Sequence, residues 1–183
     1  MVIIERDRRY APDDILKICT TTSQKSTSSI EKKQLYEAEV VAGMLKAMEK
    51  APECLGDYIQ IVNPAVEYTP DIRVLSVNPS GKNIPVEDVE VVSFTNHSKR
   101  EGILAFFLRT KLSPVYAYPK ETVILCHVDM QVKDQINMAQ RVSDNLQNMP
   151  QVKHRMYLLF GDPQTHNCTL AQVFPELVYF ESK

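Results

Sequence analysis

The sequence predicts a mixed α/β fold in which a central mixed β-sheet is flanked by helices. A long amphipathic segment, residues 29–50, precedes three short runs rich in β-branched residues, and segments of alternating helical and strand character follow. The chain has 183 residues, of which 44% are hydrophobic and 24% charged, a balance typical of one globular domain that buries its own core. We therefore expect a single domain over residues 1–183, with a core of about 29–160 and a C-terminal extension of 161–183.

The N-terminal third is predicted to be helical. Residues 12–19 begin with Pro12, which suits a first helical turn, and two acidic residues follow it, which favour the positive end of a helix. The polar segment 20–27 competes with regular backbone pairing and predicts a loop. Residues 28–31 have the spacing of a capping box, and apolar residues then recur on one face, so we expect a helix over about 29–50.

Beyond Pro52 the pattern changes to strands separated by turn signals. The turn signals are Asn63-Pro64 and the run Asn78-Pro79-Ser80-Gly81. The three β-rich runs cover residues 58–62, 72–77 and 86–94. Consecutive strands joined by short turns are naturally antiparallel, so we expect an antiparallel unit here.

The second half of the chain alternates helices with strands. The predicted elements are a helix over 102–108, a strand over 122–128, a helix over 134–149 and a strand over 156–160. The tail is expected to add a short helix at 170–174 and a last strand at 177–180. Strands joined through helices are naturally parallel, which together with the antiparallel unit predicts a mixed sheet.

Charge and composition exclude several classes of protein. The net charge of -2 argues against a protein that coats nucleic acid by bulk electrostatics, so a nucleic-acid substrate must be argued from a local site. The four cysteines lie far apart, the N-terminus lacks the apolar stretch of a signal peptide, and no apolar run approaches the ~20 residues of a membrane-spanning helix. We therefore expect an intracellular protein of the cytoplasm or nucleus with reduced thiols, neither secreted nor embedded in a membrane.

Common catalytic and cofactor motifs are missing from the sequence. With only five glycines there is neither a P-loop nor a dinucleotide fingerprint, and no nucleophilic Ser or Cys motif appears. Cys126 and His127 adjoin at the end of a predicted strand, and His166 and Cys168 lie in a later loop, but their spacing fits no standard zinc module. Cys126 is better explained as a small core residue.

Acidic residues mark the start of one predicted strand and the middle of the next. Asp71 directly precedes the strand 72–77, and Glu90 follows nineteen residues later. Cleavage of a phosphodiester uses divalent cations to activate water and neutralise the phosphate, and hard cations prefer carboxylate oxygens. Glu37 or Glu39 could add a third carboxylate, since both lie beside the apolar stripe of the first long helix. The pattern indicates a metal site.

This order of elements, with Pro70-Asp71 followed by Glu90, resembles the PD-(D/E)XK nuclease superfamily, whose shared core is helix, three strands, helix, strand. The resemblance spans roughly residues 29–128. Within the superfamily, the chain is most similar to the cap-snatching endonuclease domains of segmented negative-strand RNA viruses. It implies a hydrolase that cuts RNA and works as one domain of a larger polymerase. The ligands of Mn²⁺ or Mg²⁺ implied by the resemblance are Glu37 or Glu39, Asp71, Glu90 and the backbone carbonyl of Val91.

The sequence departs from the family motif at its lysine. In the motif a lysine two residues after the acid steadies the attacking hydroxide, but this position is Val92. Some cap-snatching domains carry the lysine on the following helix, so Lys99, Lys111 or, less well, Arg109 could replace it. The helical histidine of one subgroup is also missing from residues 29–50. The site either belongs to the subgroup with a helical glutamate or has lost activity.

Each acidic residue also has a purely structural interpretation. Asp71 could serve a turn, Glu90 could face solvent, and Glu37 and Glu39 could be solvated flanks of an amphipathic helix. Asp88 has the parity of Glu90 in the strand and is a rival for the acid. Two functions therefore remain: a metal-dependent nuclease acting on RNA, and an inactive module of the same fold that serves as a binding or assembly subunit.

Overall fold

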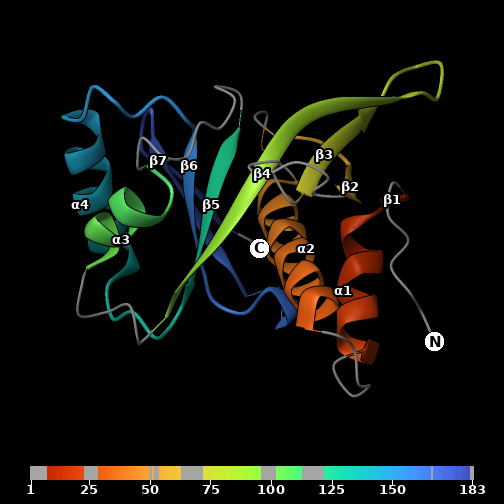
Figure 1. Cartoon of the computed structure of the whole chain (residues 1–183), viewed down its shortest axis with the longest axis horizontal. Helices are drawn as coiled ribbons and strands as arrows, with labels where there is room; N and C mark the ends of the chain where they lie inside the picture. Colours follow the sequence, from red (N-terminus) through yellow and green to blue (C-terminus); the bar gives the residue numbers. More distant parts are fainter. Residues whose placement is uncertain are drawn as a thin grey trace.

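A computed structural model shows an eight-stranded mixed sheet with helices on both faces (Figure 1). The structure describes residues 8–22, 29–49, 51, 54–62, 72–95, 102–112, 122–165 and 167–181. The helices are α1 (Pro12–Thr22), α2 (Ser29–Met48), α3 (Ile103–Thr110) and α4 (Gln135–Gln147), with a short 3₁₀ helix, η2, at Pro163–Thr165. This arrangement confirms the predicted mixed α/β class.

The eight strands lie across the sheet in the order in which they occur along the chain. They are β1 (Arg9–Tyr10), β2 (Tyr58–Ile61), β3 (Ile72–Val77), β4 (Asn83–Thr95), β5 (Val123–Asp129), β6 (Met156–Phe160), β7 (Thr169–Phe174) and β8 (Val178–Glu181). The pairs from β1 to β4 are antiparallel, β4–β5 and β5–β6 are parallel, and β6 to β8 are antiparallel. The parallel pairs are those joined through α3 and α4, as expected, because a parallel connection needs a crossover.

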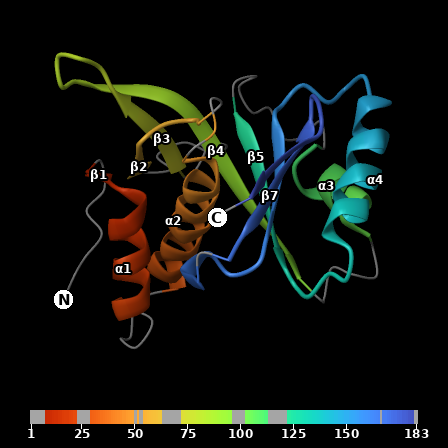
Figure 2. The ribbon, with the colours of Figure 1, turned by 180° about the vertical axis from the view of Figure 1, so that it is seen from behind.

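The sheet separates two apolar cores. Figure 2 shows from behind the helices that cover them, α1 and α2 beside one part of the sheet and α3 and α4 beside the other. Strand side chains alternate between the faces, so neighbouring residues of one strand enter different cores. The core shared with α1 and α2 contains Ile15, Val41, Met44, Val89, Val91 and Leu125. The core shared with α3 and α4 contains Phe94, Phe106, Phe107, Cys126, Val142 and Leu146. A residue's parity in β4 thus decides which helices it meets.

Three parts of the sheet differ from the sequence prediction, and the first is β1 (Arg9–Tyr10), a strand that is not expected from the sequence. The prediction of a short helix at 170–174 is wrong, because these residues form β7. Leu170 and Val173 of this strand are fully buried on opposite faces of the sheet. Pairing with the free edge of β6 satisfies the backbone there and overrides local helix preference. Residues 161–183 were expected to lie outside the core as a C-terminal extension. Instead, β7 and β8 are two strands of the central sheet.

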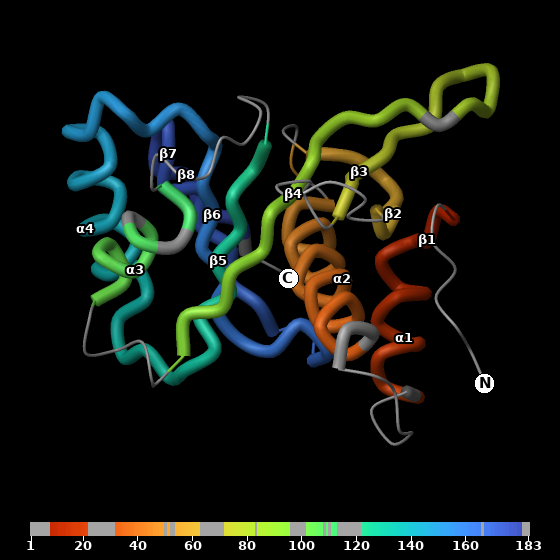
Figure 3. The backbone as a smooth tube through the Cα atoms, in the orientation of Figure 1, coloured from red at the N-terminus to blue at the C-terminus, as the bar shows by residue number. Residues whose placement is uncertain are grey.

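Strand β4 is longer than the expected 86–94 and forms a projecting hairpin with β3 (Figure 3). Asn78 closes the turn, because its Oδ1 accepts hydrogen bonds from the backbone N–H groups of Ser80 and Lys82 at 3.1 and 2.9 Å. Ile84 and Val86 on this arm remain 45% and 42% exposed, which explains why burial patterning alone missed the start of the strand.

Within the described ranges, no helix combines the length and apolar character needed to cross a membrane.

Candidate functional site

Glu90 lies in the middle of β4, where its backbone pairs with Ile124 of β5. Its side chain shares a face with Phe94, which packs against α3, whereas Val89 and Val91 on either side belong to the α2 core. Glu90 is only 6% exposed. Glu90 is therefore a buried acid on the face of the sheet turned away from α2. The alternative expectation, that Glu90 faces solvent, is wrong.

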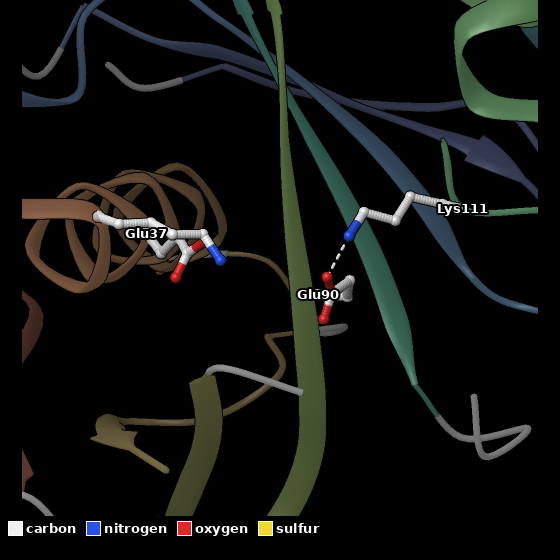
Figure 4. Close-up of polar contacts among 4 residues, drawn as sticks. Glu37, Glu90 and Lys111 are labelled. Atoms are coloured by element: carbon white, nitrogen blue, oxygen red, sulfur yellow. Dashed lines mark hydrogen bonds and ion pairs between the residues drawn. The ribbon is translucent and has the colours of Figure 1, made fainter. Parts of the chain in front are cut away.

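Lys111 supplies the positive charge for this buried acid. Its Nζ contacts Glu90 Oε1, and the two side chains are 15% and 8% exposed (Figure 4). Lys111 follows the last turn of α3, where its backbone N–H donates to Phe107 O at 2.9 Å. A charge-assisted bond between two largely buried side chains is strong, because little water competes for either partner. The structure thus brings together Glu90 and one of the lysines that the sequence offered from the following helix.

Asp88, the rival acid, has its own cation one strand away. Arg73 lies directly across from it on β3 and donates from Nε to Oδ1 at 2.7 Å and from Nη2 to Oδ2 at 3.2 Å. This forked bond to Asp88 raises the pKa of Arg73 further above its ordinary value. Because Asp88 and Glu90 share parity in β4, two cation–anion pairs lie next to each other on one face of the sheet.

The first residue of β3, Ile72, pairs with Val89, the chain neighbour of Glu90. Asp71 directly precedes Ile72 in the sequence and lies, like Lys99, outside the described residues. The side chain of Val91 is buried on the α2 face, so only its backbone carbonyl could meet a ligand beside Glu90. Arg109 is exposed on α3 and its guanidinium lies 5.8 Å from the centroid of the Phe106 ring.

The structure does not bring the helical glutamates together with Glu90. Glu37 is 3% exposed on α2, on the opposite side of β4 (Figure 4), and pairs with Lys33 at 3.2 Å. Glu39 lies on the same helix, half-buried near η2. Both positions follow from the packing of α2 against Val89 and Val91, because strand alternation then sends Glu90 to the other face. The predicted convergence of three carboxylates is therefore not formed by Glu37 or Glu39.

Burial raises the pKa of Glu39 above its ordinary value of 4.5; a hydrogen bond from Gln164 acts in the opposite direction, and the charge of Asp162 raises the pKa further. The folded protein thus holds this proton more tightly than the unfolded chain. The resulting stabilisation is complete below the unfolded pKa and is lost as the pH rises through the higher folded pKa. We expect Glu39→Gln to raise the melting temperature by a few degrees at neutral pH.

The gain from Glu39→Gln should shrink as the pH falls toward 4.5, where the wild-type carboxyl is protonated as well. Thermal unfolding from about pH 4 to about pH 8 checks this dependence. Glu176→Gln, at an exposed position in the turn before β8, is the matched control for the loss of one negative charge and should leave the melting temperature at neutral pH close to that of the wild type. A gain that stays constant over this range would contradict the assignment.

A second polar cluster, which we call the Tyr36 network, lies between α2 and the sheet. The Tyr36 hydroxyl is hydrogen-bonded to His127 Nδ1 at 2.7 Å and to Ser93 Oγ at 3.0 Å. His127 Nε2 donates to the carbonyl of Gly161 at 2.8 Å, since a carbonyl can only accept. Burial raises the pKa of Tyr36 to about 12, partly offset by the bond to Ser93, so the phenol remains protonated. The network ties α2 to β4, β5 and the end of β6.

A cleft of about 510 Å³ adjoins this network at the carboxyl ends of β5 and β6. Its walls include His127, Asp129, Lys133 and Asp162. From the sequence, His127 is considered only as part of a Cys/His zinc site whose spacing fits no standard module. The available signal was its position near the carboxyl end of a buried parallel strand, the edge at which open α/β sheets bind ligands. Glu90 pairs near the opposite end of β5, so the cleft is separate from the Glu90 site.

Comparisons with family models, with curated proteins and with solved structures found no match. The likeness to the PD-(D/E)XK superfamily thus stays a resemblance of residues and element order. In the part of the chain that the structure describes, no group of three or more His, Cys, Asp or Glu side chains is placed to hold a metal ion. Glu90 offers a carboxylate oxygen of the kind that Mn²⁺ and Mg²⁺ prefer, but among the described residues it does not belong to a group of three such ligands.

Proposed function

We propose that this protein is a metal-dependent nuclease domain of PD-(D/E)XK type that cleaves phosphodiester bonds in RNA. One observation carries the proposal: the buried Glu90 of β4 meets the helix-borne Lys111, and its neighbour Val89 pairs with the residue that follows Asp71. This contact supports the proposal, because it puts a lysine from the end of α3 beside the acid, where Val92 stands at the usual lysine position.

The order and pairing of the elements support the same proposal. The run α2, β2, β3, β4, α3, β5 is the helix, three strands, helix, strand order of the superfamily core, with the first three strands antiparallel and the last one parallel to β4. A phosphodiesterase of this kind would act intracellularly as one domain of a larger polymerase, as the likeness to cap-snatching endonucleases implies.

The carboxylate and carbonyl oxygens of the proposed site are the type of ligand atom that a hard divalent cation prefers. In the proposed site Asp71 and Glu90 would hold Mn²⁺ or Mg²⁺ with the backbone carbonyl of Val91. Glu37 would take no part because it lies on the other side of β4 (Figure 4), and Glu39, on the same helix, lies beside Gln164 of η2. The cation supplies activation of water and neutralisation of the phosphate. Lys111 contributes a fixed positive charge next to Glu90, and the apolar core around α3 keeps water from this side of the acid.

The second candidate function is a binding or assembly module with an inactive site. Lys111 already neutralises Glu90, so the fold needs no metal to accommodate this buried charge, and Val92 occupies the usual lysine position. In this alternative the Glu90–Lys111 pair is only structural, and divalent cations should have no effect on stability.

Melting temperature with and without millimolar Mn²⁺, together with cleavage of a labelled single-stranded RNA, separates the two functions. A working site gains stability from Mn²⁺, because a ligand that binds only the folded state shifts unfolding by mass action. We expect Asp71→Ala and Glu90→Gln to abolish both the thermal shift and the cleavage. Asp144→Asn, an exposed position on α4, is the control and should retain both. Absence of shift and cleavage in the wild type would overturn the nuclease proposal.

A further inference from the structure

The cleft at the carboxyl ends of β5 and β6 has no part in the proposed nuclease site. Its volume of about 510 Å³ lies in the range of pockets that bind small molecules. Glu90 pairs with Ile124 near the start of β5, whereas the cleft begins at His127 near the end of that strand. Ligands of open α/β sheets bind at this edge, beyond the carboxyl ends of parallel strands. We therefore consider what the lining of the cleft can hold.

The floor of the cleft is fixed by His127, which is 5% exposed. Its Nε2–H donates to the carbonyl of Gly161 at 2.8 Å, so its Nδ1 accepts from the Tyr36 hydroxyl at 2.7 Å. Both ring nitrogens of the neutral imidazole are thus engaged within the protein, and the bond to Gly161 ties the end of β5 to the end of β6. A ligand would meet a preformed floor and take its polar contacts from other lining residues.

Two of these lining residues are acids at the ends of adjacent strands. Asp129 is the last residue of β5, and Asp162 follows the end of β6. Val128 pairs with Phe160 in the parallel register, so the two acids leave the sheet within one residue of each other, on strands about 4.8 Å apart. Both are exposed. Carboxylates on neighbouring strand ends repel each other, and a positive group between them relieves the repulsion.

The negative charge of both acids reaches groups behind the cleft. Burial is the main cause of the raised pKa of Tyr36, and the charge of Asp129 raises it further. Burial likewise raises the pKa of Glu39, and the charge of Asp162 adds to this increase. Among the described residues of the lining, Lys133 is a single basic side chain against two acids. The electrostatic potential in the cleft is therefore negative and favours a cation.

An apolar wall stands beside the acids. Met130 and Val132 line the cleft from the segment between β5 and α4, and both are half-buried against the core of α3 and α4. A bare inorganic cation gains nothing from such a wall, and the described residues offer no group of three metal-binding side chains. A ligand with an aliphatic part next to its positive group uses both surfaces.

We propose that this cleft binds an organic cation, an amine or guanidinium group on an aliphatic stem, with the charge between Asp129 and Asp162 and the stem against Met130 and Val132. The inference does not rest on the proposed nuclease function. Its ligand chemistry has two sources, a free small amine and a basic side chain of a peptide, which the experiment separates.

Isothermal titration of the whole chain at low salt tests the proposal, with cadaverine and agmatine as cations and pentanediol as the uncharged molecule of the same length as cadaverine. We expect both cations to bind and pentanediol not to bind. Asp129→Asn and Asp162→Asn should each weaken the binding of agmatine by about tenfold or more, because an amide keeps the shape of the side chain and loses its charge. Asp144→Asn, at an exposed position on α4, is the matched control and should bind as the wild type does.

The Asp162→Asn variant is chosen to preserve the fold. Asp162 Oδ1 accepts the backbone N–H of Gln164 at 2.9 Å, and the amide oxygen of asparagine can accept the same bond. A second measurement uses the wild-type chain with ¹³C-labelled methionine methyl groups. We expect the NMR signal of Met130, assigned through Met130→Leu, to move on saturation with agmatine. The signal of Met156, fully buried at the opposite end of β6, should stay in place.

A blocked peptide with one arginine distinguishes the two sources of the cation. Binding of the peptide as tight as that of agmatine supports the proposal and assigns the cleft to a basic side chain; binding of agmatine without the peptide supports it and assigns a free small amine. The proposal is overturned if neither cation binds, if pentanediol binds as well as cadaverine, or if both Asp→Asn variants keep the wild-type affinity. None of these outcomes depends on Mn²⁺ or RNA, so the nuclease proposal is tested separately.

Discussion

Lys111→Met should lower the free energy of unfolding in the absence of metal by about 3–5 kcal/mol, the range for breaking a buried ion pair. The reason is that Glu90, 6% exposed on the α3 face, would keep a charge in an apolar environment without its cation. Urea unfolding at neutral pH measures this loss.

The double variant Glu90→Gln with Lys111→Met distinguishes the ion pair from simple loss of packing. When both charges are replaced by groups of similar shape, most of the stability should return, since neither buried charge is left uncompensated. Lys133→Met, exposed and outside this pair, should remain within about 0.5 kcal/mol of the wild type. A double variant as unstable as Lys111→Met alone would contradict the assigned origin of the effect.

Phe107→Ala should cost about 3–5 kcal/mol of stability, the usual range for truncating a fully buried phenylalanine. Phe107 is 0% exposed in the core between α3, α4 and the sheet. An eight-residue helix is marginal on its own, and its N-cap residue, Gly102, has no side chain that could form a capping hydrogen bond, so packing must hold the helix in place. Since the carbonyl of Phe107 accepts the N–H of Lys111, the same change should weaken the position of the lysine.

Leu104→Ala is the matched control for Phe107→Ala, because Leu104 lies on the same helix but is only partly buried. We expect it to cost less than half as much in urea unfolding. If Mn²⁺ stabilises the protein, Phe107→Ala should also alter the Mn²⁺ concentration at half-maximal shift, which loss of core volume far from the site would not do. Equal losses for the two variants would contradict the central role of Phe107.

Much of the fold could be predicted because its elements carry strong local patterns. Helix α2 begins with a capping-box sequence and continues with a regular apolar stripe, and the buried strand β5 opens with the apolar run 123–126. The tail was harder to predict, since pairing with β6 overrides the local helix preference of residues 170–174. Their state depends on the free edge of β6, which is a property of the assembled sheet.

The candidate site was predicted in part. Glu90 lies near the start of β3 because consecutive strands pair in antiparallel fashion, as the sequence predicts. Lys111, which contacts Glu90, was one of the basic residues expected to replace the lysine of the motif. The helical glutamates were placed with Glu90 because they flank the stripe of α2, yet α2 covers the other face of the sheet. The Tyr36 network was missed because its members come from α2, β4 and β5, far apart in the chain.

The class of fold, the order of most elements and the residues with acidic or basic chemistry follow from the amino-acid sequence alone, because hydrophobic period and turn chemistry are local properties. Only the tertiary structure decided that Glu90 is buried with Lys111 while Glu37 lies across the sheet. Strand alternation fixes that adjacent residues face opposite ways, but which face receives which helix depends on the path of the whole chain.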